Sequence, residues 1–563
     1  MGHRVAYDIN LCDFQLERAK GRFDAFLLSS TLLSYGGAVM NFSNLNTYEN
    51  MVKEGEESSF HTRYERAVER FVQSLGVRTK YESLIDGKVV STGKHFTDTS
   101  PIDTDMVVGD FSLGGKKEAS LAISSARRAF QTWSVMDLDK RLVIFRKAAE
   151  IMRRELFEIA AAITIDNGKN RYEAVGEVDE AVDFISFYAD RMEARNGFRE
   201  DTNPAYEDER PVSVMRPYGV WAVVCPFNFP IAISTGMLTA AIITGNTAVL
   251  KPSTPAPLAV HMLYDVYERA GVPPGVINLL SGSGSLAGEA LVSSDKIDGI
   301  AFTGSREVGY KLLASSLRRY PIPVITELGG KNPAIVTDKA DLAKAIAGVA
   351  SSAFGYSGQK CSACSRAYVH ELVYDEFMIY LMKHLSRLRI GDPREKATFT
   401  GPVIHQKALD DYLAHSQMAR IDGVVHAGGE AMKGRLSKGF YATPTIVTGL
   451  PEDHFMIKNE LFLPILCVQR FTDLKDAVRR ANDVDYGLTS GIYSEDEDEV
   501  KYFFENIETG VSYANRARGA TTGSMVGSQP FGGWKGSGST GLGSGTDMYL
   551  TQYMKQQSRT VAR

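Results

Sequence analysis

Short apolar runs alternate with helical stretches between residues 212 and 326. The runs are VWAVVC (220–225), TAVLK (247–251), VINLL (276–280) and GIAF (299–302). Uniformly apolar runs of this length, separated by helices, predict the strands of a parallel sheet that is covered on both faces. A second αβ series runs from AIV (334–336) to about residue 515 and predicts a second domain. The pattern therefore predicts an α/β fold.

The N-terminal part of the chain follows a different pattern. TRYERAVERFVQSLG (62–76) places its apolar residues on one helical face and stops at a glycine, so it predicts an amphipathic helix. LIDGKVV (84–90) predicts a hairpin, and a second strong helix is predicted from about 139 to 159. We interpret residues 1–84 as helices that pack on the core, with a contact to a partner chain as the alternative.

The segment AFLLSSTLLSYGGAVM (25–40) is apolar enough to resemble a weak signal peptide or membrane anchor. It starts too far from the N-terminus for an ordinary signal peptide, and its Ser, Thr, Tyr and Gly residues dilute the run below what a spanning helix needs. We therefore predict neither, and no association with a membrane.

Polar and glycine-rich stretches follow each of the four apolar runs: CPFNFP (225–230), KPST (251–254), SGSGSLAG (281–288) and TGS (303–305). In parallel sheets ligands bind beyond the carboxyl ends of the strands, which is where these stretches lie. Backbone N–H groups at a helix start can face a phosphate, and Ser305 is a predicted helix cap. The two glycine-containing turns together favour a nucleotide ligand.

Charge and cysteine content narrow the class of protein. The chain has 563 residues, with 63 basic against 68 acidic residues and a net charge of −5, which leaves no general basic field for nucleic acid. Five cysteines in so long a chain do not form a disulfide framework, and we predict a cytoplasmic location.

Two of the cysteines, Cys361 and Cys364, lie three residues apart in FGYSGQKCSACSR (354–366). A zinc clip would need two further ligands, and the sequence has no second C-x-x-C or C-x-x-H, so we predict no metal. A redox pair of the thioredoxin type is expected in a much smaller αβ unit. A nucleophile and a packed core residue are the remaining interpretations.

Five motifs that follow one another along the chain decide between the nucleophile and the packed core residue. CPFNFP, ELGGKNP (327–333), GQKCSA (358–363), NELFLPIL (459–466) and PFGGWKGSG (530–538) resemble the aldehyde dehydrogenase superfamily, and the resemblance runs from about residue 85 to the C-terminus. It implies a Rossmann-type cofactor domain, a second α/β catalytic domain and a small oligomerisation element.

The resemblance also implies catalytic roles. Cys361 matches the nucleophile, which adds to an aldehyde to give a thiohemiacetal and then a thioester. Asn228 and the backbone N–H of Cys361 match the donors to the oxyanion, and Glu327 matches the general base for the water that releases the acid. Lys360 and the charge of a nicotinamide are expected to favour the thiolate. Cys364 is then a small packed residue.

By the same resemblance, the cofactor is NAD, with NADP possible. Lys251 matches the lysine that holds the adenosine ribose, and Thr254 stands where an acid often takes the 2′-hydroxyl. Glu460 and Phe462 match positions around the nicotinamide ribose, although Leu463 departs from the usual glycine. The other residues predicted to bind the cofactor are Phe227, Gly284, Gly304 and Ser305.

Within the superfamily, the chain resembles most the enzymes that oxidise L-glutamate γ-semialdehyde to L-glutamate in proline breakdown, the 1-pyrroline-5-carboxylate dehydrogenases. PFN, the lysine and serine of GQKCSA, and TTGSMVGSQPFGG (521–533) carry this resemblance. The residues it implies for the substrate are Phe229, Ser362, Gly523, Ser524 and Phe531. NRARGATTGS is longer than the usual segment and adds Arg518, so another semialdehyde or aliphatic aldehyde is the alternative substrate. A non-catalytic binding or structural protein is a remote alternative.

Domain boundaries follow from the same alignment. We predict an N-terminal extension (1–84), a cofactor domain (85–326) with an oligomerisation hairpin near 201–218, a catalytic domain (327–532) and a C-terminal oligomerisation tail (533–563). The hairpin and tail lead us to expect a homo-oligomer, a dimer or higher.

Overall fold

The computed structural model of the chain describes residues 47–77, 79–318, 320–517 and 525–563. The chain divides into two units, Met1–Asn41 and Phe42–Arg563, and all described residues belong to the second. The segment 25–40, for which we predicted neither signal peptide nor anchor, lies outside the described residues. No helix among the described residues is long and apolar enough to cross a membrane.

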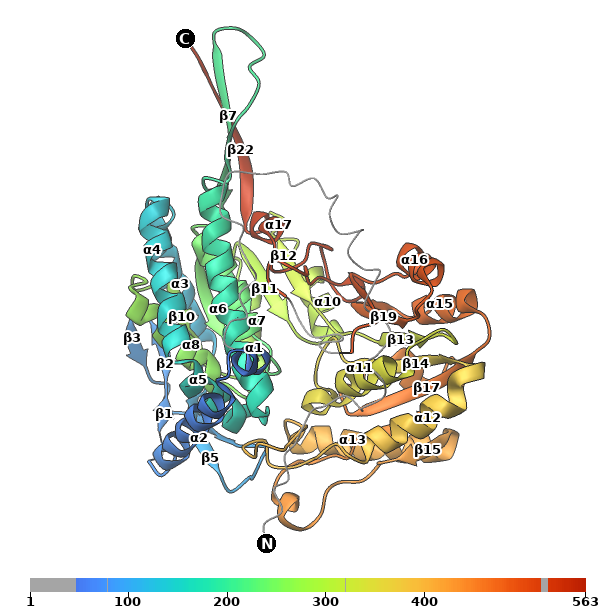
Figure 1. Cartoon of the computed structure of the whole chain (residues 1–563). Coiled ribbons are helices and arrows are strands. Elements are labelled where there is room, and N and C mark those ends of the chain that lie inside the picture. Colours follow the sequence, from blue (N-terminus) through green and yellow to red (C-terminus); the bar gives the residue numbers. More distant parts are fainter. Residues whose placement is uncertain (1–46, 78, 319, 518–524) are drawn as a thin grey trace. The chain divides into compact units, whose positions relative to one another are not determined.

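The first seven-stranded sheet has the order β12-β11-β8-β9-β10-β2-β3 (Figure 1). Its strands are β2 (Ser83–Ile85), β3 (Lys88–Val90), β8 (Val220–Val224), β9 (Thr247–Lys251), β10 (Ile277–Leu279), β11 (Gly299–Thr303) and β12 (Val324–Glu327). The strands from β12 to β10 pair in parallel, whereas the predicted hairpin β2–β3 joins β10 antiparallel. All four apolar runs are strands, as predicted.

Helices cover both faces of this sheet, which explains why its strands are apolar throughout. Trp221 and Val223 of β8 pack in one core cluster with α4–α8, and the intervening Ala222 packs in another with α3, α9 and α10. The helices are α3 (Lys116–Trp133), α4 (Leu138–Arg154), α5 (Leu156–Asn167), α6 (Arg171–Ala194), α7 (Ala232–Ile243), α8 (Leu258–Ala270), α9 (Glu289–Val292) and α10 (Arg306–Ala314).

The prediction of one helix from 139 to 159 is wrong. The chain breaks at Glu155, whose backbone angles (φ −100°, ψ 19°) separate α4 from α5. The two helices have different surroundings: α4 is amphipathic, whereas all but one residue of α5 is buried. The chain therefore has to turn from the surface into the core, and an ion pair from Arg269 to Glu155 (2.6 Å) holds the turn.

The N-terminal helices α1 (Tyr48–Lys53) and α2 (Glu57–Ser74) pack on the core, and α2 contains most of the predicted amphipathic helix. Phe60 and Tyr64 are fully buried, and the Tyr64 hydroxyl lies 2.6 Å from Thr164 Oγ1 on α5. Arg171, at the start of α6, donates to Glu65 at 2.9 Å. The described part of the extension therefore makes intramolecular core contacts.

The second seven-stranded sheet has the order β15-β16-β17-β14-β13-β19-β20. Its strands are β13 (Asn332–Val336), β14 (Cys364–His370), β15 (Val424–Ala427), β16 (Thr445–Thr448), β17 (Ile465–Phe471), β19 (Thr489–Tyr493) and β20 (Val511–Ala514). Its helices are α11 (Leu342–Phe354), α12 (Glu371–Leu385), α13 (Gln406–Asp422), α14 (Phe455–Lys458), α15 (Leu474–Asn482) and α16 (Glu497–Asn506). The second αβ series predicted from the sequence is confirmed.

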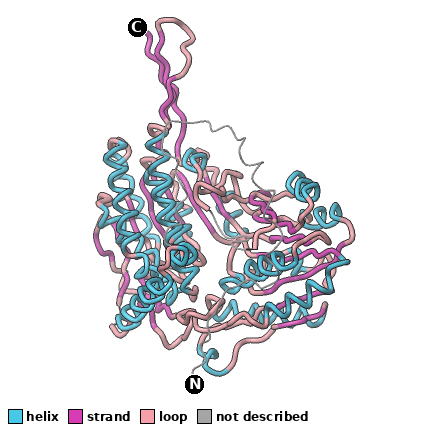
Figure 2. The backbone as a smooth tube through the Cα atoms, viewed as in Figure 1, coloured by secondary structure: helices cyan, strands magenta, loops and turns pink. Residues whose placement is uncertain are grey.

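Three small sheets complete the described structure. Two of them are β1 (Lys80–Tyr81), β5 (Val107–Ser112) and β4 (His95–Thr99), and β18 (Tyr486–Gly487) with β21 (Trp534–Lys535). The third combines β6 (Arg199–Asp201), β7 (Glu209–Pro217) and the C-terminal β22 (Met554–Ala562), which follows α17 (Asp547–Thr551). β7 and β22 pair over nine residues and extend together away from the helices (Figure 2). All residues of β22 except Met554 are exposed.

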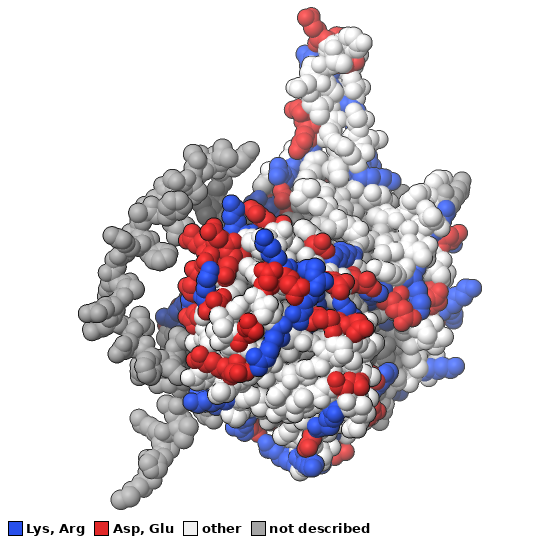
Figure 3. Space-filling view, turned by 90° about the vertical axis from the view of Figure 1, so that its right-hand side faces the viewer, with Lys and Arg blue, Asp and Glu red and all other residues white. Residues whose placement is uncertain are grey.

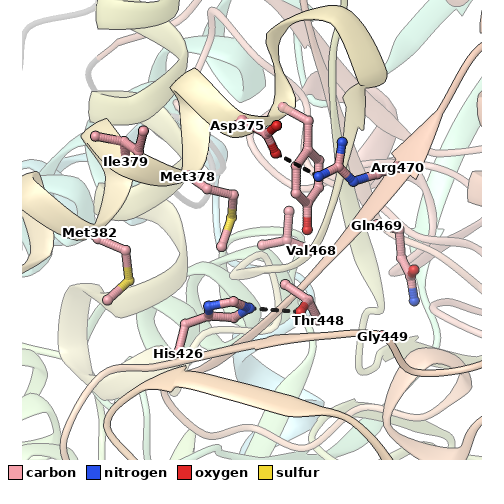
Figure 4. Close-up of a pocket in the computed structure, with 11 residues that line it drawn as sticks. Asp375, Met378, Ile379, Met382, His426, Thr448, Gly449, Val468, Gln469 and Arg470 are labelled. Carbon is pink, nitrogen blue, oxygen red and sulfur yellow. Dashed lines mark hydrogen bonds and ion pairs between the residues drawn. The ribbon is translucent and has the colours of Figure 1, made fainter.

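Acidic and basic side chains are interspersed over the face shown in Figure 3. A groove of about 870 Å³ lies between α12 and β17 (Figure 4). Its lining is Tyr374, Asp375, Met378, Ile379, Met382, His426, Thr448, Gly449, Val468, Gln469 and Arg470. None of the residues predicted for catalysis, cofactor or substrate lines this groove.

Candidate active site

Cys361 lies in a tight loop between α11 and β14. The loop starts with a 3-10 turn, η2 (Gly355–Gly358), in which Tyr356 and Ser357 have positive φ values of 49° and 52°. Such conformations cost about 1 to 3 kcal/mol each and persist only where the surroundings fix them. Here the Ser357 N–H donates to Thr400 Oγ1 at 2.8 Å. The loop that presents Cys361 is therefore rigidly anchored.

Asn332 holds the part of this loop around Cys361 through hydrogen bonds. Its Nδ2 donates to the carbonyls of Cys361 (2.7 Å) and Ala363 (2.9 Å), and its Oδ1 accepts from the Thr489 N–H at 3.0 Å. The side chain thus ties the nucleophile loop to β19. Sequence reasoning missed Asn332, although it stands inside the quoted motif ELGGKNP.

Cys361 is half-buried and packs against a small apolar cluster. Burial raises the pKa of this thiol, and the nearby carboxyls of Glu460 and Glu327 raise it further, while the N–H groups of Ser362 and Cys361 itself lower it. The same two N–H groups are the backbone donors that an oxyanion on an adduct would meet. The thiol therefore needs a base or a bound cation before it ionises near neutrality.

Glu327 supplies a carboxyl at the end of β12. Burial raises its pKa well above the ordinary value, opposed by a hydrogen bond from the Gly533 backbone. Its Oε2 is buried without a hydrogen-bond partner among the described residues. A buried carboxyl with a raised pKa and a free oxygen has the properties of a general base that works near neutral pH.

Asn228 is buried in the loop that follows β8, between two phenylalanines. The ring of Phe227 packs edge-on against Phe462 at 5.7 Å, which joins this loop to the 459–463 loop. The ring of Phe229 lies under the Lys169 ammonium at 3.4 Å.

Cys364 is the first residue of β14 and differs from Cys361 in its surroundings. It is buried in the core cluster of the second sheet, its N–H donates to Ser352 Oγ at 3.0 Å, and its thiol donates to the Arg366 carbonyl at 3.4 Å. These contacts make Cys364 a packed core residue.

Lys251 ends β9 and is 3% exposed, with its ammonium donating to the Pro252 carbonyl at 2.7 Å. Burial lowers its pKa to about 8. A Cβ at Gly288 would lie 3.2 Å from Lys251 Cε, so the glycine leaves room beside the lysine. Thr254 is half-buried in the next loop.

The two glycine turns differ in geometry. SGSGSLAG opens a π-helical turn, η1 (Gly284–Gly288), capped by Ser283 Oγ, which accepts from the Leu286 N–H at 3.2 Å; α9 follows directly. Ser305 caps α10 as predicted, its Oγ accepting from the Val308 N–H at 3.5 Å. The Gly304 N–H donates to the Glu327 carbonyl at 3.2 Å. The second turn therefore contacts the predicted base.

Glu460 lies in the 459–463 loop, next to the nucleophile loop. Its Oε1 accepts from the Gly330 N–H at 2.9 Å, and burial raises its pKa to about 7 against the opposing effects of that N–H and the Lys331 charge. Phe462 has a positive φ of 61°, and a side chain at Gly358 would collide with the Leu463 carbonyl. The 459–463 loop therefore packs directly on the nucleophile loop.

These residues fit a nicotinamide dinucleotide. A buried lysine beside a glycine ends β9, a helix start follows each of β10 and β11, and the half-buried Glu460 carboxyl lies beside the nucleophile loop. Such groups can hold a ribose, a pyrophosphate and a second ribose in turn.

The structure describes some of the residues that we predicted for the substrate. Ser362 is 1% exposed and follows Cys361 directly, and Phe531 is 7% exposed in a small apolar cluster against which Cys361 packs. Gly523 and Ser524 lie outside the described residues.

A stripe of acids on α6 was missed by sequence reasoning. Glu173 accepts from the Lys360 ammonium at 2.6 Å, which engages the lysine that we expected to favour the thiolate. Glu177 pairs with Lys169 at 2.5 Å, both side chains being 0% exposed, and accepts from the Ile231 N–H at 2.8 Å. Both acids therefore have a cationic partner.

Glu180, one turn further along the same face, has no such partner. It makes no hydrogen bond or ion pair with the described residues, and burial together with the Glu177 charge raises its pKa to about 8. Two turns beyond it, Phe187 packs against the backbone of Gly527, next to the predicted substrate loop. Glu180 thus lies along the stripe between Lys360 and that loop.

Comparison with known proteins agrees with this geometry. The sequence pattern described as "Aldehyde dehydrogenase family" matches residues 89–559. The chain belongs to the aldehyde dehydrogenase family. The prediction of an aldehyde dehydrogenase fold and of a dehydrogenase enzyme is confirmed.

Individual relatives of this aldehyde dehydrogenase carry a more specific name. It is 35% identical to the 1-pyrroline-5-carboxylate dehydrogenase of Bacillus cytotoxicus over 88% of this chain and 95% of that protein. A Thermus 1-pyrroline-5-carboxylate dehydrogenase structure with bound NAD has a TM-score of 0.84 and 34% identity over 88% of this chain and 96% of the other.

A larger protein also contains this fold. The structure of proline utilization A from Bdellovibrio bacteriovorus has a TM-score of 0.86 and 33% identity over 92% of this chain. The chain spans 53% of the length of that protein.

Proposed function

We propose that the chain oxidises L-glutamate γ-semialdehyde to L-glutamate with NAD, in proline catabolism. The observation that carries this proposal is the pairing of the half-buried Cys361 thiol with Glu327, whose Oε2 is buried without a hydrogen-bond partner among the described residues and whose charge raises the thiol pKa. The relatives named above support the choice of substrate.

Cys361 starts the reaction. Glu327 takes the thiol proton, because its own pKa is raised and its Oε2 is free to accept. The thiolate then forms a C–S bond with the aldehyde carbon, and the oxyanion of this thiohemiacetal receives hydrogen bonds from the Cys361 N–H and the Asn228 amide. NAD, when bound, supplies the hydride acceptor, and the product left on Cys361 is a thioester.

Glu327 acts a second time after it has released the thiol proton to solvent. It then removes a proton from the water that attacks the thioester, and cleavage of the C–S bond releases the acid and restores the Cys361 thiolate. Apolar walls formed by Phe229 and Phe531 exclude other water from this centre.

Substrate recognition uses the α-carboxylate, the α-ammonium group and the methylenes of the amino acid. Ser362 and the backbone of Gly523 and Ser524 hold the α-carboxylate, and Phe229 and Phe531 pack on the methylenes. We add Glu180 as the acceptor of the α-ammonium group. Of the three acids on the α6 stripe it alone lacks an ion-pair partner among the described residues, so an ammonium group would supply the opposite charge for its half-buried carboxylate.

Cofactor binding follows the same strand ends. Lys251 and Thr254 hold the adenosine ribose, η1 and Ser305 present N–H groups to the pyrophosphate, and Glu460 holds the second ribose between Phe227 and Phe462. Because Thr254 is neutral and does not repel a 2′-phosphate, NADP is a possible second cofactor.

Charge-matched aldehydes test the substrate assignment. Ser362→Ala is expected to lower kcat/KM about tenfold to a hundredfold for glutamate γ-semialdehyde and for glutarate semialdehyde, because both carry the carboxylate. Glu180→Gln is expected to lower it by a similar factor for glutamate γ-semialdehyde only, because glutarate semialdehyde lacks the ammonium group. Both variants should leave propanal oxidation unchanged.

The matched control is Glu193→Gln, at the exposed end of the same helix, where a surface ion pair contributes little. Equal losses on all three aldehydes would show that Ser362 and Glu180 shape the nucleophile's surroundings generally. The substrate proposal would then fail, and another aldehyde would have to be assigned.

We also propose a cytoplasmic homo-oligomer of at least two chains. The β7–β22 pair exposes eight residues of β22, and α10 with the turn after it exposes large apolar side chains: Val308, Tyr310, Leu317 and Tyr320. Such surfaces are typical of protein interfaces. Light scattering of the purified chain is expected to give at least twice the 61.8 kDa chain mass, and removal of residues 554–563 should lower it. A monomeric full chain would contradict the proposal.

A further inference from the structure

A fully buried ion pair lies between the loops that carry Asn228 and Cys361. The ammonium of Lys169 lies 2.5 Å from the Glu177 carboxylate, and both side chains are 0% exposed. Burying two charges costs desolvation energy that their attraction often does not recover, so a neutral pair of similar size would be equally or more stable. The pair is therefore poorly explained by stability and needs another role.

Lys169 contacts an aromatic ring on each of the two loops. Its Nζ lies 3.4 Å from the centroid of the Phe229 ring, which follows Asn228 in the chain. The same Nζ lies 5.0 Å from the centroid of the Tyr356 ring, in the turn that leads to Cys361. Attraction between a cation and an aromatic face is stronger where water is excluded, as it is around this buried ammonium. One ammonium thus holds a ring of each loop.

Glu177 joins this ammonium to the end of the Asn228 loop. Its Oε2 accepts from the Lys169 ammonium, and its Oε1 accepts from the N–H groups of Ile231 at 2.8 Å and Ala232 at 3.3 Å, where α7 begins. Both oxygens of the carboxylate are therefore used. Together the ion pair holds the Asn228 loop at the Phe229 ring and again at the start of α7.

Asn167, two residues before Lys169, connects the same two loops. Its Nδ2 donates to the Phe227 carbonyl at 3.4 Å, and its own carbonyl accepts from the Tyr356 hydroxyl at 3.1 Å. Its Oδ1 accepts from the Lys169 N–H at 3.2 Å, which orients the backbone that carries the lysine. The contacts of Asn167 and Lys169 thus run side by side from one loop to the other.

We propose that Lys169 is a positioning residue for the oxyanion site. By holding the two rings, its ammonium sets the Asn228 amide relative to the Cys361 N–H, so that both can donate to one oxygen atom. This inference rests on the proposed roles of Asn228 and Cys361. Donors that are in place before an oxyanion forms stabilise it most, and a small displacement of one donor slows the reaction strongly. Lys169 acts through the rings and not on the substrate.

The rate of reduced nicotinamide formation in the first turnover tests this role, because the oxyanion forms and collapses before the acyl enzyme is hydrolysed. In rapid mixing of the NAD-loaded enzyme with saturating aldehyde, Lys169→Met should slow this turnover about tenfold to a hundredfold. The loss should be equal for glutamate γ-semialdehyde and propanal, because both form the same oxyanion. NAD affinity should be unchanged. Lys339→Met, which removes an exposed lysine paired with Asp496, is the matched control and should react as the wild type does.

A double-variant cycle with Asn228→Ala separates positioning from a general loss of structure. Asn228→Ala alone should slow the first turnover about a hundredfold to a thousandfold, the usual effect of removing one oxyanion donor. Adding Lys169→Met should slow it by less than about twofold more, because the relative position of two donors no longer matters when one is absent.

A second variant is needed because Lys169→Met leaves the Glu177 carboxylate buried without its cation, which destabilises the fold. Lys169→Met/Glu177→Gln removes both charges and keeps an acceptor for the Ile231 N–H. It should fold and still show the slowed first turnover, because it also lacks the ammonium.

Three outcomes would overturn the inference: a first turnover at the wild-type rate in either folded variant, a full further loss in the Asn228→Ala background, or a slowing confined to one of the two aldehydes. Unfolding of the neutral double variant would show that the pair serves stability, which also contradicts the inference. An unchanged first turnover in Asn228→Ala alone would instead refute the proposed oxyanion donor.

Discussion

Cys361→Ala is expected to reduce aldehyde oxidation by at least about ten-thousandfold, because no other thiol or hydroxyl can replace the covalent step. NAD affinity should remain, since the side chain is not assigned to the cofactor. Steady-state production of reduced nicotinamide measures the first effect, and NAD titration measures the second.

Cys364→Ala is the matched control for this variant. Cys364 is three residues away, but its thiol is packed in the core and donates to a backbone carbonyl. We expect it to keep most of the activity and to lose about 1 kcal/mol or more of unfolding free energy, because a small cavity replaces the sulfur. If a folded Cys364→Ala enzyme were as inactive as Cys361→Ala, the nucleophile would be misassigned.

Glu327→Gln is expected to slow release of the acyl enzyme by about a hundredfold to ten-thousandfold, the usual range for removal of a general base. If its main role is to activate water, formation of the acyl enzyme should be slowed less. Rapid mixing should then show one burst of reduced nicotinamide per active site, followed by slow turnover.

The rate of the burst in the Glu327→Gln enzyme distinguishes the two uses of Glu327. A burst as slow as turnover would show that the carboxyl is needed equally to activate the Cys361 thiol, whose pKa is raised by burial. Replacing the nearby Glu460 with glutamine serves as a control, because its expected effect is on NAD affinity and not on thioester hydrolysis.

Much of the fold follows from the sequence because both central sheets are buried. Runs such as TAVLK can satisfy their backbone only in a sheet that is covered on both faces, and β9 begins and ends with that run. Helix boundaries were less predictable. The break at Glu155 depends on whether a helix lies at the surface or in the core, and that depends on contacts far away in the sequence.

The candidate site was predictable where a motif is local. Cys361, Glu327, Asn228 and the cap Ser305 all stand in short quoted motifs at strand or helix ends. Glu180 carries no such signal, because an acid on a helix is ordinarily read as a solvated surface charge. Only the packing of α6 half-buries its side chain, and a charge without an ion-pair partner among the described residues is then informative.

We expect this enzyme to make L-glutamate from its γ-semialdehyde. The most direct measurement supplies the purified wild-type chain with L-glutamate γ-semialdehyde and NAD, and quantifies L-glutamate and reduced nicotinamide in the same sample, with propanal as the comparison substrate. We expect equal amounts of the two products and a kcat/KM at least about a hundredfold higher than for propanal, the contribution of two charge-assisted contacts. Reduced nicotinamide without L-glutamate, or propanal as the better substrate, would contradict it.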